Sequence, residues 1–344
     1  MRIGILTGGG DAPGLNAAIR AAARPAIAAG HTVLGIRNGW AGLLGDGDMA
    51  ELTRRSISGI LHVGGTILGS SRTNPMKVEG GGEQVQRNMQ RAQLDALIAI
   101  GGDDTLSVAA WLADQGSPVV GVPKTMDNDL SITEYCIGFD TAVSIVTEAV
   151  DRLHTTASSH HRVMVCEAMG RDTGWVALKG GLAGGADMIV IPEFPVSIDE
   201  VVEHLYHRRS QGSDFSIIVV SEGVEMEGMG SKDDASAQRD AFGHVQLSRR
   251  GVGERLASLI EERTGFETRA TVLGHTQRGG TPTAFDRIWA TQVGYWAWKL
   301  VEARDFGRMP VVRCSRVEPA AIRDVVAEQR RVPRELYDLA TVFF

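Results

Sequence analysis

The sequence has few cysteines, no excess of positive charge and no long apolar run. Its three cysteines, Cys136, Cys166 and Cys314, are odd in number and far apart, which excludes a disulfide framework or a cysteine-rich zinc site and favours a reducing compartment. The net charge of −7 argues against nucleic acid as a partner. No segment approaches the roughly 20 apolar residues of a membrane span, and the N-terminus does not resemble a signal peptide. These absences predict a cytoplasmic, enzyme-like chain with neither a nucleic-acid nor a membrane partner.

Glycine, in contrast, is abundant: the chain has 42 among 344 residues, or about 12% against the usual ~7%. The glycines cluster at 8–10, 64–65, 80–82, 101–102, 180–181, 184–185 and 279–280. Glycine clusters at strand ends let the backbone approach a ligand closely, and helix N-termini favour anions. The pattern favours binding of phosphate-bearing ligands.

Apolar and amphipathic segments alternate along the chain. Buried strands are expected at 2–6, 32–36, 96–100 and 118–122, with helices at 14–29 and 83–94. The alternation of strands and helices begins again near residue 139. Helices are expected at 142–155 and 173–183, and strands at 163–167, 188–192, 217–221 and 270–273. A capping box at 197–200, a long helix at 284–302 and a surface loop at 225–250 complete the pattern. This alternation predicts an α/β fold of two similar Rossmann-like units with mainly parallel sheets.

The loop at 7–14, TGGGDAPG, follows an expected strand and opens an expected helix. Its free amides and the helix dipole suit an anion, although a tight turn without a ligand would use the same residues. It lacks the Lys-Ser/Thr of a P-loop, and the second strand does not end in the acidic residue of a dinucleotide fold. The motif alone is therefore a weak indicator of phosphate binding.

Two further strand ends carry charged residues. The first has Asp103 and Asp104 at a helix start, where Mg²⁺ could join carboxylate and phosphate oxygens, or Asp103 could cap the helix. The second, VPKTMDNDL at 122–130, places a cation, a hydroxyl and two carboxylates within six residues. Phosphoryl transfer to a hydroxyl needs a carboxylate to take its proton and cations to spread the oxygen charge, and Asp127 is the candidate base. A solvated turn is the alternative.

Several cations also fall near strand ends. Arginine forks bind phosphate through two hydrogen bonds, which suits a phosphorylated substrate, although each arginine alone could be a surface charge. Glu222 ends a strand and could accept sugar hydroxyls, or be an ordinary surface carboxylate. The cations near strand ends are Arg72, Arg171, Arg269, His275 and Arg278.

With these residues in view, the chain resembles the 6-phosphofructokinase family almost from end to end. The motifs that carry the resemblance are LTGGGDAPGLNAAIR, GGTILGSSR, GGDDT, PKTMDND, MGR and TRATVLGHTQRGG, while 225–250 and the C-terminal tail match least. The resemblance implies the phosphofructokinase fold. It further implies a phosphoryl-donor domain at 1–138 plus about 277–327, and a domain for fructose 6-phosphate at 139–276 plus about 328–344.

The resemblance also implies residue roles. Asp127 would be the general base for the 1-hydroxyl of the sugar, Thr125 would contact the transferred phosphoryl group, and Arg171 would stabilise transition-state charge. The donor side would use Asp103 for Mg²⁺, and Gly10, Arg72 and Lys124 for the phosphates. The sugar phosphate would be held by Thr125, Met126, Asp127, Arg162, Met169, Gly170, Arg171, Glu222, Arg269, His275 and Arg278. Arg162 and Arg269 typically cross a subunit interface in the family, which implies a homodimer or homotetramer with active sites at subunit interfaces.

Two positions bear on the phosphoryl donor. Members that use ATP have glycine where this chain has Asp104 and Lys124, and this pair resembles pyrophosphate-dependent members. A carboxylate at 104 would repel an α-phosphate, whereas an ammonium at 124 can pair with a pyrophosphate oxygen. The resulting hypothesis is a reversible, glycolytic transfer from pyrophosphate to fructose 6-phosphate. The alternatives are an ATP-dependent phosphofructokinase, a catalytically silent sugar-phosphate-binding subunit and a dinucleotide oxidoreductase.

Overall fold

The computed structural model describes residues 1–45, 47–227 and 250–344, and the chain divides into two compact units. The first unit contains Met1–Asp140 and Arg278–Arg330. The second contains the described residues from Thr141 to Gln277, together with Arg331–Phe344. Most of the loop expected at 225–250 lies outside the described residues.

The first unit is built on a five-stranded sheet in the order β3-β2-β1-β4-β5. Four strands are parallel and the edge strand β3 is antiparallel. The strands are β1 (Arg2–Thr7), β2 (Thr32–Ile36), β3 (Met49–Glu51), β4 (Ala96–Gly101) and β5 (Val119–Pro123). Side chains alternate between the two faces, so that Ile98 packs on one face and Leu97 on the other. Both faces are therefore buried, which explains the continuous apolar runs in the sequence.

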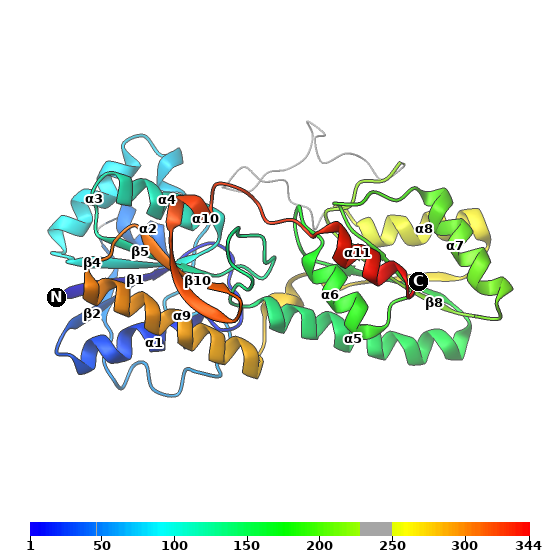
Figure 1. Ribbon diagram of the computed structural model, residues 1–344, viewed down its shortest axis with the longest axis horizontal. Coiled ribbons are helices and arrows are strands. Elements are labelled where there is room, and N and C mark those ends of the chain that lie inside the picture. Colours follow the sequence, from blue (N-terminus) through cyan, green and yellow to red (C-terminus); the bar gives the residue numbers. More distant parts are fainter. Residues whose placement is uncertain (46, 228–249) are drawn as a thin grey trace. The chain divides into compact units, whose positions relative to one another are not determined.

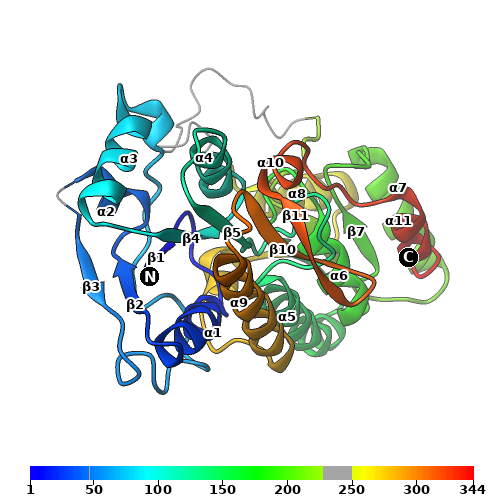
Figure 2. The same ribbon diagram turned by 60° about the vertical axis from the view of Figure 1, so that its left-hand side comes forward.

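Helices cover both faces of this sheet (Figures 1 and 2). On one face lie α1 (Leu15–Ala28) and α9 (Ala284–Ala303), whose buried residues share a core with Ile3, Ile5 and Ile98. The core on the other face contains residues of α2 (Trp40–Leu44), α3 (Gly81–Arg91) and α4 (Asp103–Asp114). A short 3₁₀ helix, Pro75–Lys77, precedes α3. The expected parallel sheet with helices on both faces is confirmed.

A two-stranded antiparallel hairpin, β10 (Arg308–Arg313) and β11 (Arg316–Ala321), follows α9 and leads into α10 (Ile322–Val325). The sequence did not predict it. Its two-residue turn has Cys314 and Ser315 at φ 48° and 61°, the left-handed geometry that hairpins normally assign to Asn and Gly. The turn therefore carries no sequence signal.

The second unit has a four-stranded, all-parallel sheet in the order β7-β8-β6-β9. Its strands are β6 (Val163–Ala168), β7 (Met188–Val190), β8 (Ser216–Ser221) and β9 (Thr268–Val272). Its helices are α5 (Phe139–His160), which begins at the end of the first unit, α6 (Trp175–Gly184), α7 (Ile198–Ser210), α8 (Val252–Thr264) and α11 (Arg334–Thr341), with a 3₁₀ helix at Gly274–Arg278. The predicted capping box is present at the start of α7, where Ser197 and Glu200 exchange hydrogen bonds.

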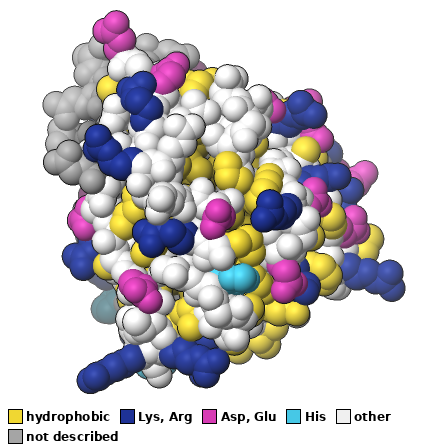
Figure 3. All heavy atoms as spheres, turned by 90° about the vertical axis from the view of Figure 1, so that its left-hand side faces the viewer, with side chains coloured by type: hydrophobic (Ala, Val, Ile, Leu, Met, Phe, Trp, Pro, Cys, Tyr) yellow, Lys and Arg dark blue, Asp and Glu magenta, His cyan; other side chains and the backbone are white. Residues whose placement is uncertain are grey.

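None of the helices in the described part of the chain has the length and apolar composition of a membrane span. On the face drawn in Figure 3, Lys and Arg side chains are interspersed with Asp and Glu.

Candidate active site

In the first unit, the loops that follow β1, β4 and β5 meet at the carboxyl edge of the sheet. The amide of Gly8 donates to the carbonyl of Ile100 at 2.9 Å, and that of Lys124 donates to Gly101 at 3.0 Å. Ligands of open α/β sheets bind at this edge. The segment at 70–72 joins it, because the amide of Gly9 donates to the carbonyl of Ser71 at 3.1 Å. Arg72, which is exposed, therefore follows a residue that is hydrogen-bonded to the glycine-rich loop.

Lys124 is buried against this loop, with only 3% of its surface exposed. Its ammonium donates to the carbonyl oxygens of Gly8, at 3.1 Å, and of Gly10. A buried ammonium is costly unless such acceptors surround it. The contact brings together Lys124 and Gly10, for which the family resemblance implies one phosphate site. It also places the positive charge of Lys124 at the turn between β1 and α1.

Arg278 lies at the same loop. Its Nη1 donates to the carbonyl of Asp11 at 3.3 Å, and a Cβ atom added at Gly10 would lie 2.7 Å from Nη1. Glycine at position 10 thus leaves room for the guanidinium. The Nε of Arg278 is buried without a hydrogen-bond partner among the described residues. A buried donor of this kind favours an anionic ligand that can satisfy it.

The turn after β5 presents the carboxylates. The hydroxyl of Thr125 accepts from the amide of Asp127 at 3.2 Å. Asn128 adopts a left-handed conformation, with φ 55°, and its side chain accepts from the amide of Cys136 at 2.9 Å. These bonds fix Asp127 and Asp129 on either side of Asn128. Met126, in the same turn, is fully buried.

Asp129 lies in a strongly acidic and buried environment. Burial, and then the charges of Asp127 and Asp103, raise its pKa from 3.8 to about 7, although Gln329 donates a hydrogen bond to it at 3.2 Å. Neighbouring carboxylates disfavour one another's ionised forms unless a cation lies between them. The electrostatics of this turn therefore suit a divalent ion.

Asp103 and Asp104 form the first turn of α4, whose N-cap is Gly102, and no side chain caps the helix. The structure therefore does not support Asp103 as the N-cap residue of α4. Within the described residues, no three His, Cys, Asp or Glu side chains form a ready cluster for a metal. Mg²⁺ commonly uses only one or two carboxylates and completes its shell with substrate phosphates and water. The residues at this edge fit that mode of binding.

In the second unit, Glu222 orders the loop that carries Arg171. Its Oε1 accepts from the amides of Gly170 and Arg171 at 3.3 and 3.2 Å, and Glu222 is itself buried. Arg171 has φ 51°, a strained conformation that these hydrogen bonds help to stabilise. Gln277 adds a support that the sequence analysis missed, since its Oε1 accepts from the amide of Met169 at 3.3 Å. Its only signal was its place in the TQRGG motif.

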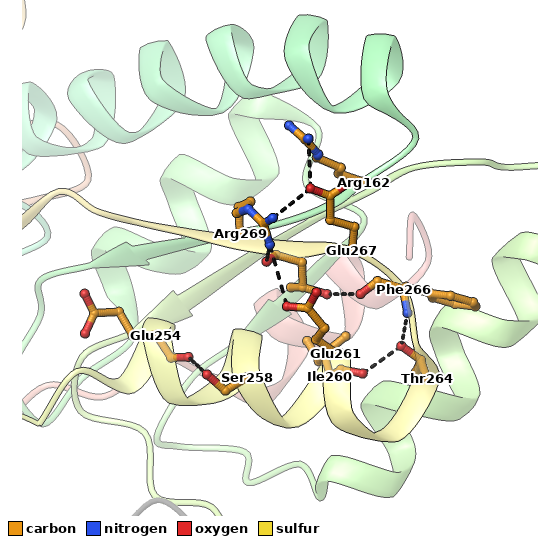
Figure 4. A network of polar contacts seen from close by, with 10 residues as sticks. Arg162, Glu254, Ser258, Ile260, Glu261, Thr264, Phe266, Glu267 and Arg269 are labelled. Carbon is orange, nitrogen blue, oxygen red and sulfur yellow. Dashed lines mark hydrogen bonds and ion pairs between the residues drawn. The ribbon is translucent and has the colours of Figure 1, made fainter.

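Arg162 and Arg269 lie together at the amino-terminal ends of β6 and β9, where both contact Glu267 (Figure 4). Arg171 follows the carboxyl-terminal end of β6. The six residues of β6 separate the two ends by about 20 Å at ~3.3 Å per residue. His275 is exposed in the 3₁₀ helix after β9. The second unit thus carries two separate groups of predicted site residues.

A glycine-rich loop with a buried cation, next to a turn of carboxylates at the edge of a parallel sheet, defines an α/β enzyme site for phosphate-bearing substrates. The family model described as Phosphofructokinase matches residues 2–301, and the chain belongs to this family.

Relatives over the full length carry two kinds of name. The chain is 54% identical, over 100% of both chains, to a pyrophosphate–fructose 6-phosphate 1-phosphotransferase of Amycolatopsis methanolica. It is 46% identical, over 98% of both chains, to an ATP-dependent 6-phosphofructokinase of Streptomyces coelicolor. Among solved structures, the T-state phosphofructokinase of Pichia pastoris superposes with a TM-score of 0.81 and 30% identity, over 99% of this chain and 38% of that one.

Proposed function

We propose that this chain transfers a phosphoryl group reversibly between inorganic pyrophosphate and the 1-hydroxyl of fructose 6-phosphate. The observation that carries the choice of donor is the buried ammonium of Lys124 on the carbonyls of the glycine-rich loop. It supplies a fixed positive charge for a compact diphosphate. The carboxylate of Asp104, in the first turn of α4, adds negative charge where the further phosphate of a nucleotide would pass.

The chemistry uses the turn after β5. Asp127 accepts the proton of the 1-hydroxyl while the hydroxyl oxygen of the sugar forms a bond to the phosphorus. The bridging P–O bond of pyrophosphate breaks, and phosphate is released. Thr125 contacts the transferred group and Arg171 stabilises its charge. Asp103 would hold Mg²⁺, which supplies charge neutralisation to the pyrophosphate oxygens. The first unit is in this view the donor domain and the second the fructose 6-phosphate domain, in a homodimer or homotetramer.

The placement of Arg162 supports an oligomer. Arg162 and Arg171 lie at opposite ends of β6, so one sugar phosphate at Arg171 is not expected to reach Arg162 of the same chain. In the proposed assembly, Arg162 and Arg269 bind the 6-phosphate of a substrate held by a partner subunit. His275, Glu222, Met169 and Gly170 would bind the sugar within one chain. The buried thiols of Cys136 and Cys166 suit the proposed cytoplasmic location.

Initial rates with fructose 6-phosphate and Mg²⁺, with pyrophosphate or ATP as donor, test the proposal. Activity with pyrophosphate and not with ATP is the expected result. Activity with ATP alone would refute the donor assignment and leave the role of Asp127 standing. No activity with either donor would refute the proposed function.

A further inference from the structure

Three charged side chains share one face at the amino-terminal edge of the second sheet. The pairing of β6 with β9 sets Val163 opposite Thr268, and the amide of Val163 donates to the carbonyl of Glu267 at 3.0 Å. Arg162 and Glu267, which directly precede these two adjacent strands, are thereby neighbours. Glu267 and Arg269 are two residues apart, so they point to the same face. The strand register alone therefore brings Arg162, Glu267 and Arg269 together.

The two arginines converge on a single carboxylate oxygen. Oε1 of Glu267 lies 2.8 Å from Nη2 of Arg162 and 2.7 Å from Nη2 of Arg269 (Figure 4). Arg269 is held further by the carbonyl of Thr268, at 2.8 Å from Nη1, and by Glu261 of α8, 3.6 Å away. The hydrogen bond from Arg162, followed by the charges of both arginines, lowers the pKa of Glu267. The carboxylate thus stays ionised in the pH range where phosphate esters are dianions.

We propose that Glu267 is a positioning residue, which holds the guanidinium groups of Arg162 and Arg269 side by side so that both bind the phosphate of one fructose 6-phosphate. This inference rests on the proposed function for its ligand. Two guanidinium groups repel each other at short range, and arginine side chains have many rotamers. A shared carboxylate offsets the repulsion and fixes the pair before the substrate arrives.

The pair retains donors for a ligand. The Nε of Arg162 is buried and has no hydrogen-bond partner among the described residues. Among the described residues, the ion pair with Glu267 engages Arg162 at its Nη2 atom. A phosphate has enough acceptor oxygens to take two arginine forks at once. A phosphate bound beside Glu267 would therefore complete the hydrogen bonding of Arg162.

A competing role predicts the opposite effect. If the carboxylate of Glu267 occupied the place of the phosphate, its removal would free both arginines and strengthen substrate binding. If it positions them, its removal lets the arginines separate and weakens substrate binding. The sign of the change in KM for fructose 6-phosphate decides between these roles.

The experiment compares Glu267→Ala, Glu267→Gln and, as a matched control, Glu262→Gln at an exposed position of α8. Rates are measured with Mg²⁺ while fructose 6-phosphate and pyrophosphate are varied in turn. We expect Glu267→Ala to raise the KM for fructose 6-phosphate about 3- to 10-fold, with kcat and the KM for pyrophosphate within about two-fold of wild type. Glu267→Gln keeps an acceptor oxygen and should show a smaller rise. Glu262→Gln should match wild type.

An unchanged or lower KM for fructose 6-phosphate in Glu267→Ala would overturn the inference. A variant in which kcat falls and the KM values for fructose 6-phosphate and pyrophosphate rise by similar factors would overturn it as well. If Glu267→Ala does not fold, the same criteria apply to Glu267→Gln. Calorimetric binding of fructose 6-phosphate separates this inference from the proposed function. If wild type binds the sugar phosphate without transferring a phosphoryl group, only the proposed function is refuted. The role of Glu267 is then tested by the binding constants of the variants for fructose 6-phosphate. A wild-type chain that binds none refutes both.

Discussion

The turn after β5 in the first unit and the arginine pair of the second unit hold their charged side chains in different ways. In the first unit, Lys124, Asp127 and Asp129 are 3%, 5% and 7% exposed. Lys124 donates to backbone carbonyls, the amide of Asp127 donates to Thr125 of the same turn, and Asp129 accepts from Gln329. In the second unit, the side chains of Arg162 and Arg269 are 30% and 52% exposed and form ion pairs with glutamates.

The difference in burial matches two different tasks, stabilising a transition state and binding a phosphate reversibly. Charges fixed in a buried site act strongly on a developing transition state and need little rearrangement during the reaction. Partly exposed arginines can exchange water for a phosphate and release it again, and each such pair contributes less. Changes at the turn after β5 should therefore reduce kcat most, and changes at the arginine pair should raise KM most.

The largest effect should come from the base. Asp127→Asn keeps the size of the side chain and removes its capacity to take a proton, so kcat should fall by roughly 10²–10⁴. The KM for fructose 6-phosphate should change little, because the amide can still accept a hydrogen bond. Steady-state rates with pyrophosphate measure both quantities.

Asp151→Asn, at an exposed position of α5, serves as the control for Asp127→Asn and should retain full activity. If Asp127→Asn kept most of its turnover, Asp127 would not be the base. The contrast between a catalytic turn after β5 and a recognition site at Arg162 and Arg269 would then lose its main support.

Much of the fold could be predicted from the sequence because it depends on local patterns. Strands such as β1 and β4 are buried on both faces, so they appear as continuous apolar runs between glycine-rich turns. The hairpin β10–β11 could not be predicted, because its turn places Cys314 and Ser315 in a conformation that neither residue signals. The antiparallel edge strand β3 is only three residues long, too short for a periodic pattern.

The site was predicted less evenly. Lys124, Asp127 and Asp129 stood out because charged residues follow a buried strand. The environments of Lys124 and Glu222 could not be foreseen, since their carbonyl and amide partners come from distant segments. The contact of Glu267 with both arginines depends on the register of β6 against β9, and register is a property of the folded sheet.

Lys124 should show the next largest effect. Lys124→Met keeps most of the side-chain volume and removes the charge, and kcat/KM for pyrophosphate should fall about 10- to 100-fold, as for a charge-assisted contact. Lys124→Gly should weaken pyrophosphate use as well, and combined with Asp104→Gly it should admit ATP. An unchanged KM for pyrophosphate in Lys124→Met and Lys124→Gly would contradict the donor argument.

Arg162→Lys tests the recognition site with a smaller expected effect. Lysine keeps the charge and loses both the fork and the Nε donor, so the KM for fructose 6-phosphate should rise about 5- to 10-fold with kcat nearly unchanged. Arg152→Lys, at an exposed position of α5, is the matched control and should behave as wild type. A loss confined to kcat would show that Arg162 acts in the chemical step and would remove the distinction between the units.

An effect on stability rather than on rates is expected at Asp129, and it tests burial apart from catalysis. Its pKa is raised from 3.8 to about 7, so between these values the folded chain retains a proton that the unfolded chain has released. The resulting stabilisation is complete below about pH 4 and is lost as the pH rises through about 7. Asp129→Asn cannot ionise, so wild type should lose about 1–3 kcal/mol more than this variant between about pH 4.5 and 8, measured by urea unfolding without Mg²⁺. Mg²⁺ with pyrophosphate should reduce the difference, since a cation at this turn favours the ionised carboxylates. Parallel pH profiles would mean that Asp129 is hydrated, and the contrast in burial between the two units would then rest on Lys124 and Asp127.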